Sequence, residues 1–392
     1  MSPHQNQFFD GRFNQQIKGN LLDTKYDVVV IGGGLAGLVS SFLLAKDGKS
    51  VVLVEKKKYP FHRVCGEYVS NETRNFLERH KLLPDDISLP EINRFQFTDT
   101  HGKAAVIKLD LGGFGISRYL LDNWIYKRCL EVGVSVLQST QVESIDFDPE
   151  TDCFFSTLSN HDILNSTYVI GAFGKRSKLD KVLNRDFIKK RSPYLGVKYH
   201  VKTDLPLDLV SLHNFHGGYC GANAVEEGRF NLCYLGSRDQ LRAAGNIPEM
   251  EEKFLFKNPV LKEIFQTAEF LFDKPEVINE INFDPKAPVE NHMLMAGDSA
   301  GLITPLCGNG MAIAIQSGKL AAEAILAGGQ REKIESTYAN QWSGLFKGRL
   351  KLGRTVQKLF GSPKASSFTR ALIHNVPFAA DQIIRNTHGQ PF

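Results

Sequence analysis

A stretch of nineteen residues near the N-terminus, DVVVIGGGLAGLVSSFLLA from Asp27 to Ala45, constrains the fold of this chain most strongly. It carries one charge, at its first position, so its apolarity alone would suit a membrane span. A spanning helix, however, needs about 20 apolar residues, and each internal glycine costs a helix about 1 kcal/mol relative to alanine. Four glycines, at positions 32, 33, 34 and 37, fall within the first eleven residues of the stretch. The sequence therefore predicts a turn here and not a spanning helix.

The residues around these glycines predict a strand, a turn, a helix and a second strand. Residues 26–31 (YDVVVI) have the pattern of a buried strand, residues 35–49 that of a helix stopped by Asp47-Gly48, and residues 50–55 (SVVLVE) that of another strand. In this context G-x-G-x-x-G becomes a strong signal for a dinucleotide site. The competing interpretation is a glycine turn between two core strands with no ligand.

Each motif position has a physical role in binding a dinucleotide. Gly32 permits the tight turn, Gly34 lets the main chain approach a diphosphate, and Gly37 lets helix and strand pack closely. The N–H groups at the helix start, at Leu35 and Ala36, attract the phosphate charge. An acid at the end of the second strand accepts hydrogen bonds from the ribose hydroxyls, and Glu55 occupies that position.

A second segment, residues 292–329, favours FAD over NAD. HMLMAGDSAG has the pattern of a short strand entering a loop, and GMAIAIQSGKLAAEAILAGG that of a helix ended by Gly328 and Gly329. Asp298 is the only charge between Glu290 and Lys319, and a carboxylate there can bind the hydroxyls of a ribityl chain. The Gly308-Asn309-Gly310 turn orients the start of a second helix toward any group bound beside it. If that group is the pyrimidine edge of a flavin, the helix dipole would stabilise the anion that forms when the flavin is reduced.

These stretches resemble the FAD-dependent oxidoreductases of the para-hydroxybenzoate hydroxylase fold, and within them the geranylgeranyl reductase-like branch. The resemblance covers most of the chain and implies FAD as cofactor, with NAD(P)H as electron donor. It assigns Asp298 to the ribityl chain and Gly310-Met311 to the flavin ring. It also places Arg118, at a helix start, against the cofactor, and Arg63, Cys65, Gly66 and Glu67 of HRVCGEYVS near the isoalloxazine. The family's G-D-x-x-G…P…G-x-G pattern matches Gly297, Asp298, Gly301, Pro305, Gly308 and Gly310.

Two departures limit what the resemblance implies. The family's G-A-D-G segment reads GAFGKRS here, so Phe173 stands where an acid supports the cofactor and the approach of the nicotinamide. The branch's aromatic signature, Y-x-W-x-F-P, is replaced by GGYCGANAVEEGRF around Tyr219. The substrate's identity is therefore not carried over.

The pattern predicts an α/β fold in which a Rossmann-type FAD-binding domain interleaves with an antiparallel-sheet substrate domain. RFQFTDTHGKAAVIKLDL alternates around His101-Gly102 like a hairpin, and LGVKYHV, LVSLHNF and RFNLCYLG are three further strands. A helical stripe of Trp342, Leu345, Phe346, Leu350, Val356, Leu359 and Phe360 marks a C-terminal helical region. We expect an arm at 1–25, cofactor segments at 26–80, 116–178 and 286–330, substrate segments at 81–115 and 179–285, and C-terminal helices at 331–392.

Composition sets the remaining expectations. With 42% apolar and 23% charged residues the chain has the composition of a globular protein, and its first 25 residues lack a secretory pattern, so we expect a cytoplasmic protein. Six scattered cysteines without C-x-x-C predict reduced thiols and no metal site. From Gly344 onward eight Lys or Arg face one acid, Asp381, a charge of +7. This basic tail favours either peripheral membrane contact or a solvated helix face, and its lack of interleaved aromatics disfavours nucleic acid.

The leading functional hypothesis is an FAD enzyme that takes electrons from NAD(P)H and reduces a double bond in an apolar isoprenoid, polyene or lipid-like substrate. The alternative is a monooxygenase that hydroxylates an aromatic or lipid-like substrate. A halogenase is disfavoured because W-x-W-x-I-P is absent, and a non-enzymatic, FAD-stabilised membrane-associated protein is a further alternative. Candidate catalytic residues are Cys65, Tyr219 and His216. The sequence does not indicate the oligomeric state.

Overall fold

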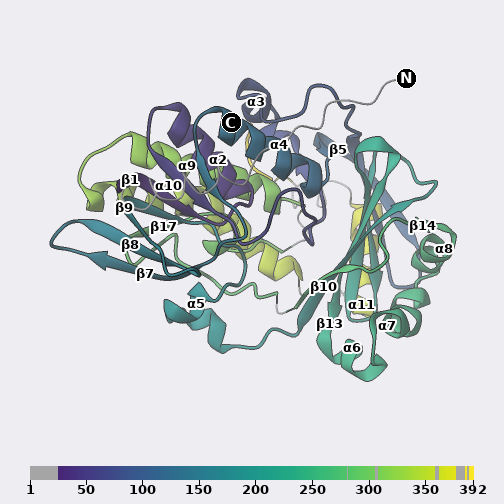
Figure 1. Ribbon diagram of the computed structural model, residues 1–392. Coiled ribbons are helices and arrows are strands. Elements are labelled where there is room, and N and C mark those ends of the chain that lie inside the picture. The colour runs from purple at the N-terminus through teal and green to yellow at the C-terminus, as the bar shows by residue number, and fades with distance from the viewer. Residues whose placement is uncertain (1–24, 280, 305–307, 358–361, 377–384, 386–387) are drawn as a thin grey trace, which may run out of the picture.

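The computed structural model describes residues 25–279, 281–304, 308–357, 362–376, 385 and 388–392, and Figure 1 shows two sheets side by side. The first sheet has eight strands in the order β16-β17-β9-β1-β2-β6, with β7 and β8 joined to β9. Its strands are β1 Lys25–Ile31, β2 Val51–Val54, β6 Ser135–Leu137, β7 Val142–Asp148, β8 Cys153–Leu158, β9 Ile163–Gly171, β16 Val289–Glu290 and β17 Met293–Met295. The strands from β17 to β6 run parallel.

The predicted strand, turn, helix and strand unit is confirmed. Strand β1 leads through the glycine turn into helix α2 (Leu35–Lys46), which returns to β2 with Val28 opposite Val51. Strands β1 and β2 are almost wholly buried, and burial on both faces explains their uninterrupted apolar runs. Helices α3 (Arg74–Arg79), α4 (Arg118–Glu131), α9 (Gly310–Leu326) and α10 (Arg331–Gln357) lie with α2 in this half of the molecule.

The second sheet has nine strands in the order β14-β10-β13-β12-β11-β4-β5-β3, and β15 pairs with β10. Its strands are β3 Tyr68–Ser70, β4 Glu91–Thr98, β5 Ala104–Gly115, β10 Tyr194–Lys202, β11 Leu209–Phe215, β12 Gly218–Ala224, β13 Phe230–Ser237, β14 Glu269–Phe270 and β15 Glu276–Asn279. The predicted hairpin is β4–β5, and the three other predicted strands are β10, β11 and β13. One pair, β11 with β4, is parallel, so the sheet is mixed and not purely antiparallel.

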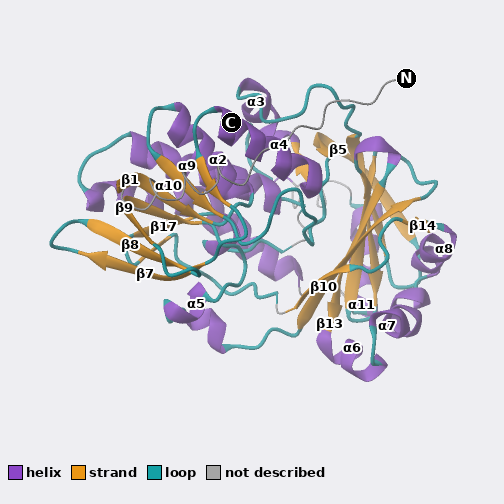
Figure 2. Ribbon diagram, viewed as in Figure 1, coloured by secondary structure: helices purple, strands orange, loops and turns teal. Residues whose placement is uncertain are grey.

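Different layers cover the two faces of the second sheet. Helices α6 (Arg238–Ala244), α7 (Ile247–Phe254) and α8 (Pro259–Thr267) pack on the outer face, where a core including Val197, Leu232 and Tyr234 is buried. The inner face of the second sheet is the one turned toward the first sheet (Figure 2). It carries a smaller apolar cluster that includes Phe97 and Leu212. Helix α11 (Pro363–Asn375) contributes Ile373 to this inner cluster. Short helix α5 (Leu179–Val182) follows β9.

Helices α2 and α9 approach each other closely through small residues. A Cβ atom added at Gly318 of α9 would lie 2.4 Å from the carbonyl oxygen of Ala36 in α2. Helix α10 then packs Trp342, Phe346 and Leu350 into the same core, whereas Leu345 of the predicted stripe is 42% exposed. Leu359 and Phe360 lie outside the described residues. No helix in the described ranges is both long and apolar enough to cross a membrane.

Gly318→Ala is predicted to destabilise the chain by about 1–3 kcal/mol, because the added methyl group must separate α2 from α9. Gly344→Ala, in the exposed part of α10 with no atom within 4 Å of an added Cβ, is the matched control. It is expected to leave stability unchanged or raise it by up to about 1 kcal/mol, since alanine favours helix. Urea unfolding of both variants measures the difference, and equal effects would contradict the packing argument.

Buried His213 is predicted to lower stability in acid. Its ring lies 3.0 Å from the Thr98 hydroxyl, and burial lowers the pKa of His213 from 6.5 to about 4. Between these values the unfolded chain binds a proton that the folded chain does not, so the free energy of unfolding falls as pH falls from 6.5 to 4, by on the order of 3 kcal/mol. In urea titrations across this window His213→Gln should lose less stability than wild type, and His101→Gln, at an exposed hairpin turn, should behave as wild type. If the free energy of unfolding falls equally with pH in wild type and in His213→Gln, His213 is not the source of the acid sensitivity.

Candidate functional site

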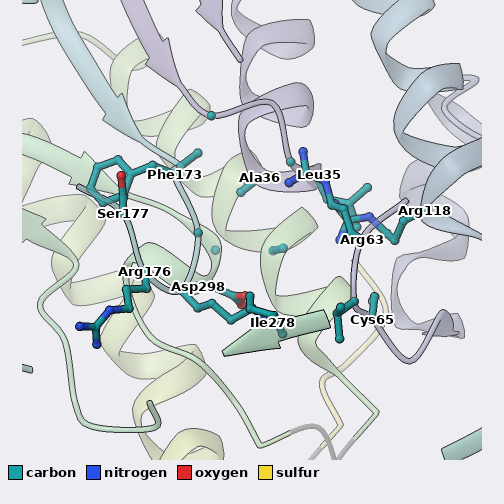
Figure 3. Close-up of a pocket in the computed structure, with 18 of the residues that line it drawn as sticks. Leu35, Ala36, Arg63, Cys65, Arg118, Phe173, Arg176, Ser177, Ile278 and Asp298 are labelled. Atoms are coloured by element: carbon teal, nitrogen blue, oxygen red, sulfur yellow. The ribbon is translucent and has the colours of Figure 1, made fainter. Parts of the chain in front are cut away.

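A cavity of about 660 Å³ lies between the two sheets, at the carboxyl ends of β1 and β2. Ligands of open α/β sheets bind at this edge. The glycine turn and the start of α2 form one wall, and Gly308, Gly310 and Met311 at the start of α9 form another. Figure 3 shows side chains from both halves of the molecule directed at this space.

The glycine turn fits the roles predicted from the motif. Gly32 has φ +104°, and an added Cβ would lie 2.4 Å from the Ala172 carbonyl oxygen. A Cβ at Gly37 would lie 2.0 Å from the Gly32 carbonyl oxygen, so this position holds helix against turn. At Gly34, by contrast, the nearest atom to an added Cβ is Arg118 Nη2 at 3.7 Å, so its side toward the cavity is open. No side chain caps the start of α2 at Leu35 and Ala36, and its first turn contains no acid.

Glu55 fixes this turn. Its carboxylate is buried and accepts hydrogen bonds from the main-chain N–H groups of Gly33 and Lys57, both at 2.9 Å. The Tyr59 hydroxyl donates to the Gly33 carbonyl. Glu55 also lines the cavity at the end of β2, so the carboxylate that holds the turn borders this space.

Arg63 and Arg118 share one buried carboxylate beside the turn. Arg63 donates to the Gly33 carbonyl at 3.0 Å, to Glu55 at 3.1 Å and to Asp122 at 2.9 Å. Arg118, the first residue of α4, donates to both oxygens of Asp122 at 2.6 and 2.8 Å. Its guanidinium also contacts the Cys65 thiol. Two arginines are thereby held against the cavity wall (Figure 3).

The opposite wall contains the second predicted segment. Asp298 lies in the turn after β17 and points into the cavity (Figure 3), where its carboxylate accepts no hydrogen bond from another described residue. Lys286 donates to the carbonyls of Asp298 at 2.8 Å and Lys175 at 2.9 Å, and burial lowers the pKa of Lys286 to about 8. Gly297 has φ +61° in this turn.

The start of α9 completes this wall. Asn309 precedes the helix, no side chain caps it, and its first turn contains no acid. Gly308, Gly310 and Met311 line the cavity. Pro305 lies outside the described residues, as does Cys307.

The three candidate catalytic residues are placed apart. Cys65 lines the cavity, whereas Tyr219 is buried in the inner apolar cluster of the second sheet and His216 is exposed between β11 and β12. The five described cysteines are free thiols. Within the described ranges no group of three or more His, Cys, Asp or Glu side chains could hold a metal ion.

A buried ionic cluster beside the cavity was not predicted as a unit. Glu67 forms an ion pair with Lys198 and contacts His200 Nε2 at 2.6 Å, and all three side chains are at most 1% exposed. The available signal was the spacing of Lys198 and His200 in an apolar strand, since residues i and i+2 share one face. No comparable sequence pattern marks Asp122 as a buried partner of the two arginines.

The residues of the cavity fit a dinucleotide. Gly34 leaves room for close approach, two helix starts without a side-chain cap supply N–H groups, and Asp298 offers a carboxylate that accepts from no donor among the described residues. The volume is also within the range of about 300–1,000 Å³ typical of ligand pockets.

Comparison with known proteins agrees with this fit. The model of the FAD binding domain family matches residues 25–338. Digeranylgeranylglycerophospholipid reductase 1 of Methanococcoides burtonii is 24% identical over 86% of this chain and 84% of that protein. Conditioned medium factor receptor 1 of Dictyostelium discoideum is 25% identical over 80% of this chain, which spans 66% of that protein.

A solved structure has the same fold. The flavin-dependent brominase Bmp2 superposes with a TM-score of 0.73 at 20% identity, covering 93% of both chains. This likeness shows the fold that the sequence predicted. Since the family model spans most of the chain, from β1 to α10, the chain belongs to the FAD binding domain family and is an FAD-dependent oxidoreductase.

Proposed function

We propose that this enzyme reduces carbon–carbon double bonds of an apolar, isoprenoid-lipid-like substrate, with NAD(P)H as electron donor. The observation that carries the proposal is the cavity between two uncapped helix starts, which meets the inner apolar cluster of the second sheet at Leu302 and Ile278. An apolar chain lying on that face would reach the cavity without crossing water.

In this proposal one FAD molecule spans the cavity. The N–H groups at the start of α2 bind its diphosphate, Glu55 binds the adenosine ribose, and Asp298 binds the ribityl chain. Segments 26–80, 116–178 and 286–330 form the cofactor domain, and segments 81–115 and 179–285 form the substrate domain. The contacting residues are Gly32, Gly34, Leu35, Ala36, Gly37, Glu55, Arg63, Cys65, Arg118, Gly297, Asp298, Pro305, Gly308, Asn309, Gly310 and Met311.

The chain's residues orient the reaction and hold its charge. FAD, when bound, supplies the two-electron hydride chemistry. The N–H groups at the start of α9 stabilise negative charge on the flavin ring that this proposal places beside them. Cys65 is the catalytic candidate that lines the cavity, and the Arg118 guanidinium contacts its thiol.

The names of relatives support the substrate class. Several are digeranylgeranylglycerophospholipid reductases, and each covers most of this chain. The electron donor would approach the loop that carries Phe173 and the cavity-lining cations Lys175, Lys178 and Lys181, which suit an anionic dinucleotide. Phe173 replaces a family acid here, and we propose that these cations dock the donor.

Anaerobic mixing tests the function. The protein is loaded with FAD, reduced with NADPH and mixed with digeranylgeranylglycerophospholipid in detergent micelles. We expect the oxidised flavin spectrum to return and mass spectrometry to show hydrogen added to the lipid, because a double bond is the electron acceptor. The fully saturated lipid is the matched control. Reoxidation only when oxygen is admitted, with a hydroxylated product, would contradict the reductase and favour a monooxygenase. A chain that binds no FAD would refute both.

We further propose peripheral membrane contact through the basic C-terminal helices, because such a substrate resides in membranes. Lys351 and Lys364 are exposed, and on α11 Phe368 is 66% exposed. A basic surface with exposed aromatic side chains binds anionic lipid, at about 1 kcal/mol per cation near the surface.

Sedimentation with vesicles containing phosphatidylserine tests this contact. Lys351→Gln with Lys364→Gln should lower partitioning roughly thirtyfold, for about 2 kcal/mol lost. The control, Lys127→Gln with Lys262→Gln, removes equal charge from exposed positions elsewhere. Binding should also fall in high salt. No sedimentation of wild type at low salt would reject the contact.

A further inference from the structure

The buried cluster of Glu67, Lys198 and His200 lies where the second sheet meets the cavity. Lys198 and His200 project from the inner face of β10, and Glu67 belongs to the Cys65-Gly66-Glu67 turn, which lines the cavity. The three side chains contact one another through ionic contacts and hydrogen bonds, and the His200 ring also packs against the rings of His62 and Phe272.

The Glu67 carboxylate is held by three donors. Lys198 and the main-chain N–H of Arg118 donate to Oε1, the latter at 2.8 Å, and His200 donates to Oε2. Burial alone would raise the pKa of Glu67, but Lys198 and His200 lower it to about 2, so it is ionised. Its main chain adopts φ +55°, a conformation that non-glycine residues rarely occupy. The fold therefore maintains this carboxylate in place despite local strain and desolvation.

The same turn is tied to the sheet through its main chain. Asn231 of β13 donates to the carbonyls of Cys65 at 3.2 Å and Gly66 at 2.9 Å. Asn223 of β12 donates to the Glu67 carbonyl at 3.4 Å. Three neighbouring strands of the second sheet, β10, β13 and β12, therefore hold the three consecutive cavity residues 65–67 through hydrogen bonds.

Glu67 also fixes the start of α4. Its bond to the Arg118 N–H positions the residue whose guanidinium contacts Cys65 and pairs with Asp122, and Asp122 in turn binds Arg63 of the glycine-turn network. A continuous chain of ion pairs and hydrogen bonds therefore runs from β10 of the second sheet to the glycine turn of the first.

We propose that Glu67 is a positioning residue that locks the second sheet to the cofactor cleft, so that Arg118 and Cys65 face the flavin in one fixed arrangement. The inference rests on the proposed FAD site. It assigns the cluster an effect on cofactor geometry and not only on stability.

The chain offers a matched control in Glu251. This glutamate is also buried and hydrogen-bonded, accepting from Tyr199 at 3.0 Å and Tyr234 at 2.8 Å, but it lies on the outer face of the same sheet. Replacing it perturbs the same sheet, and Glu251 does not line the cavity.

The test measures FAD affinity by flavin fluorescence, the visible flavin spectrum and the unfolding midpoint. Glu67→Gln should weaken FAD binding at least tenfold and shift the flavin bands, whereas Glu251→Gln should leave both unchanged. The Glu67→Gln variant can fail to fold, because it leaves the Lys198 ammonium buried without the carboxylate that pairs with it. The double variant Glu67→Gln with Lys198→Met removes that charge and should fold with a midpoint near that of Glu251→Gln, yet keep the weakened affinity and the altered spectrum.

Wild-type affinity and spectrum in a folded double variant would overturn the proposal, as would equal loss of affinity in Glu251→Gln. Wild-type protein that binds FAD but does not reduce substrate contradicts the proposed reaction alone. The two failures are therefore distinguishable.

Discussion

The close contact between α2 and α9 is the constraint on which the rest of the site depends. Each helix start carries about half a positive charge in unpaired N–H groups, and neither first turn contains an acid that would neutralise it. Gly318 against Ala36 brings the two helices together, so both positive ends face one cavity. In the absence of an anion this arrangement is electrostatically unfavourable. A negatively charged dinucleotide bound there, as proposed, would relieve it and so link the stability of the fold to its cofactor.

The carboxylates around the cavity divide into two groups. Glu55, Asp122 and Glu67 are buried, and each binds two or more donors from different segments, which makes the wall rigid. Asp298 accepts no hydrogen bond from the described residues and faces the cavity. Rigid surroundings with an available carboxylate suit a site that must hold a long, flexible cofactor in one conformation, since little of the wall needs to reorder on binding.

Local patterns predicted the parts of this molecule that depend on local physics. The first strand and helix follow from an apolar run, a glycine turn and a helical period within thirty residues. The β4–β5 hairpin follows from alternation around a turn. Strand β12 was missed because GYCGANA is rich in small residues of low strand propensity. The parallel pairing of β11 with β4 depends on a crossover that no local pattern encodes.

Within the site, the same distinction applies. The glycine motif and Glu55 were predictable because their spacing is fixed by one strand–helix–strand unit. The Glu67 cluster joins residues more than 130 positions apart, and pairing at that distance is set by the packing of the two sheets. Asp122 follows Arg118 by one helical turn, but its second partner, Arg63, comes from another segment.

A crystal structure of the protein with FAD would test the central claim most directly. The account predicts one FAD molecule whose diphosphate contacts the N–H groups of Leu35 and Ala36, with its ring at Gly310-Met311 and its ribityl chain at Asp298. A cofactor bound elsewhere, or a diphosphate that leaves the start of α2 unoccupied, would contradict it.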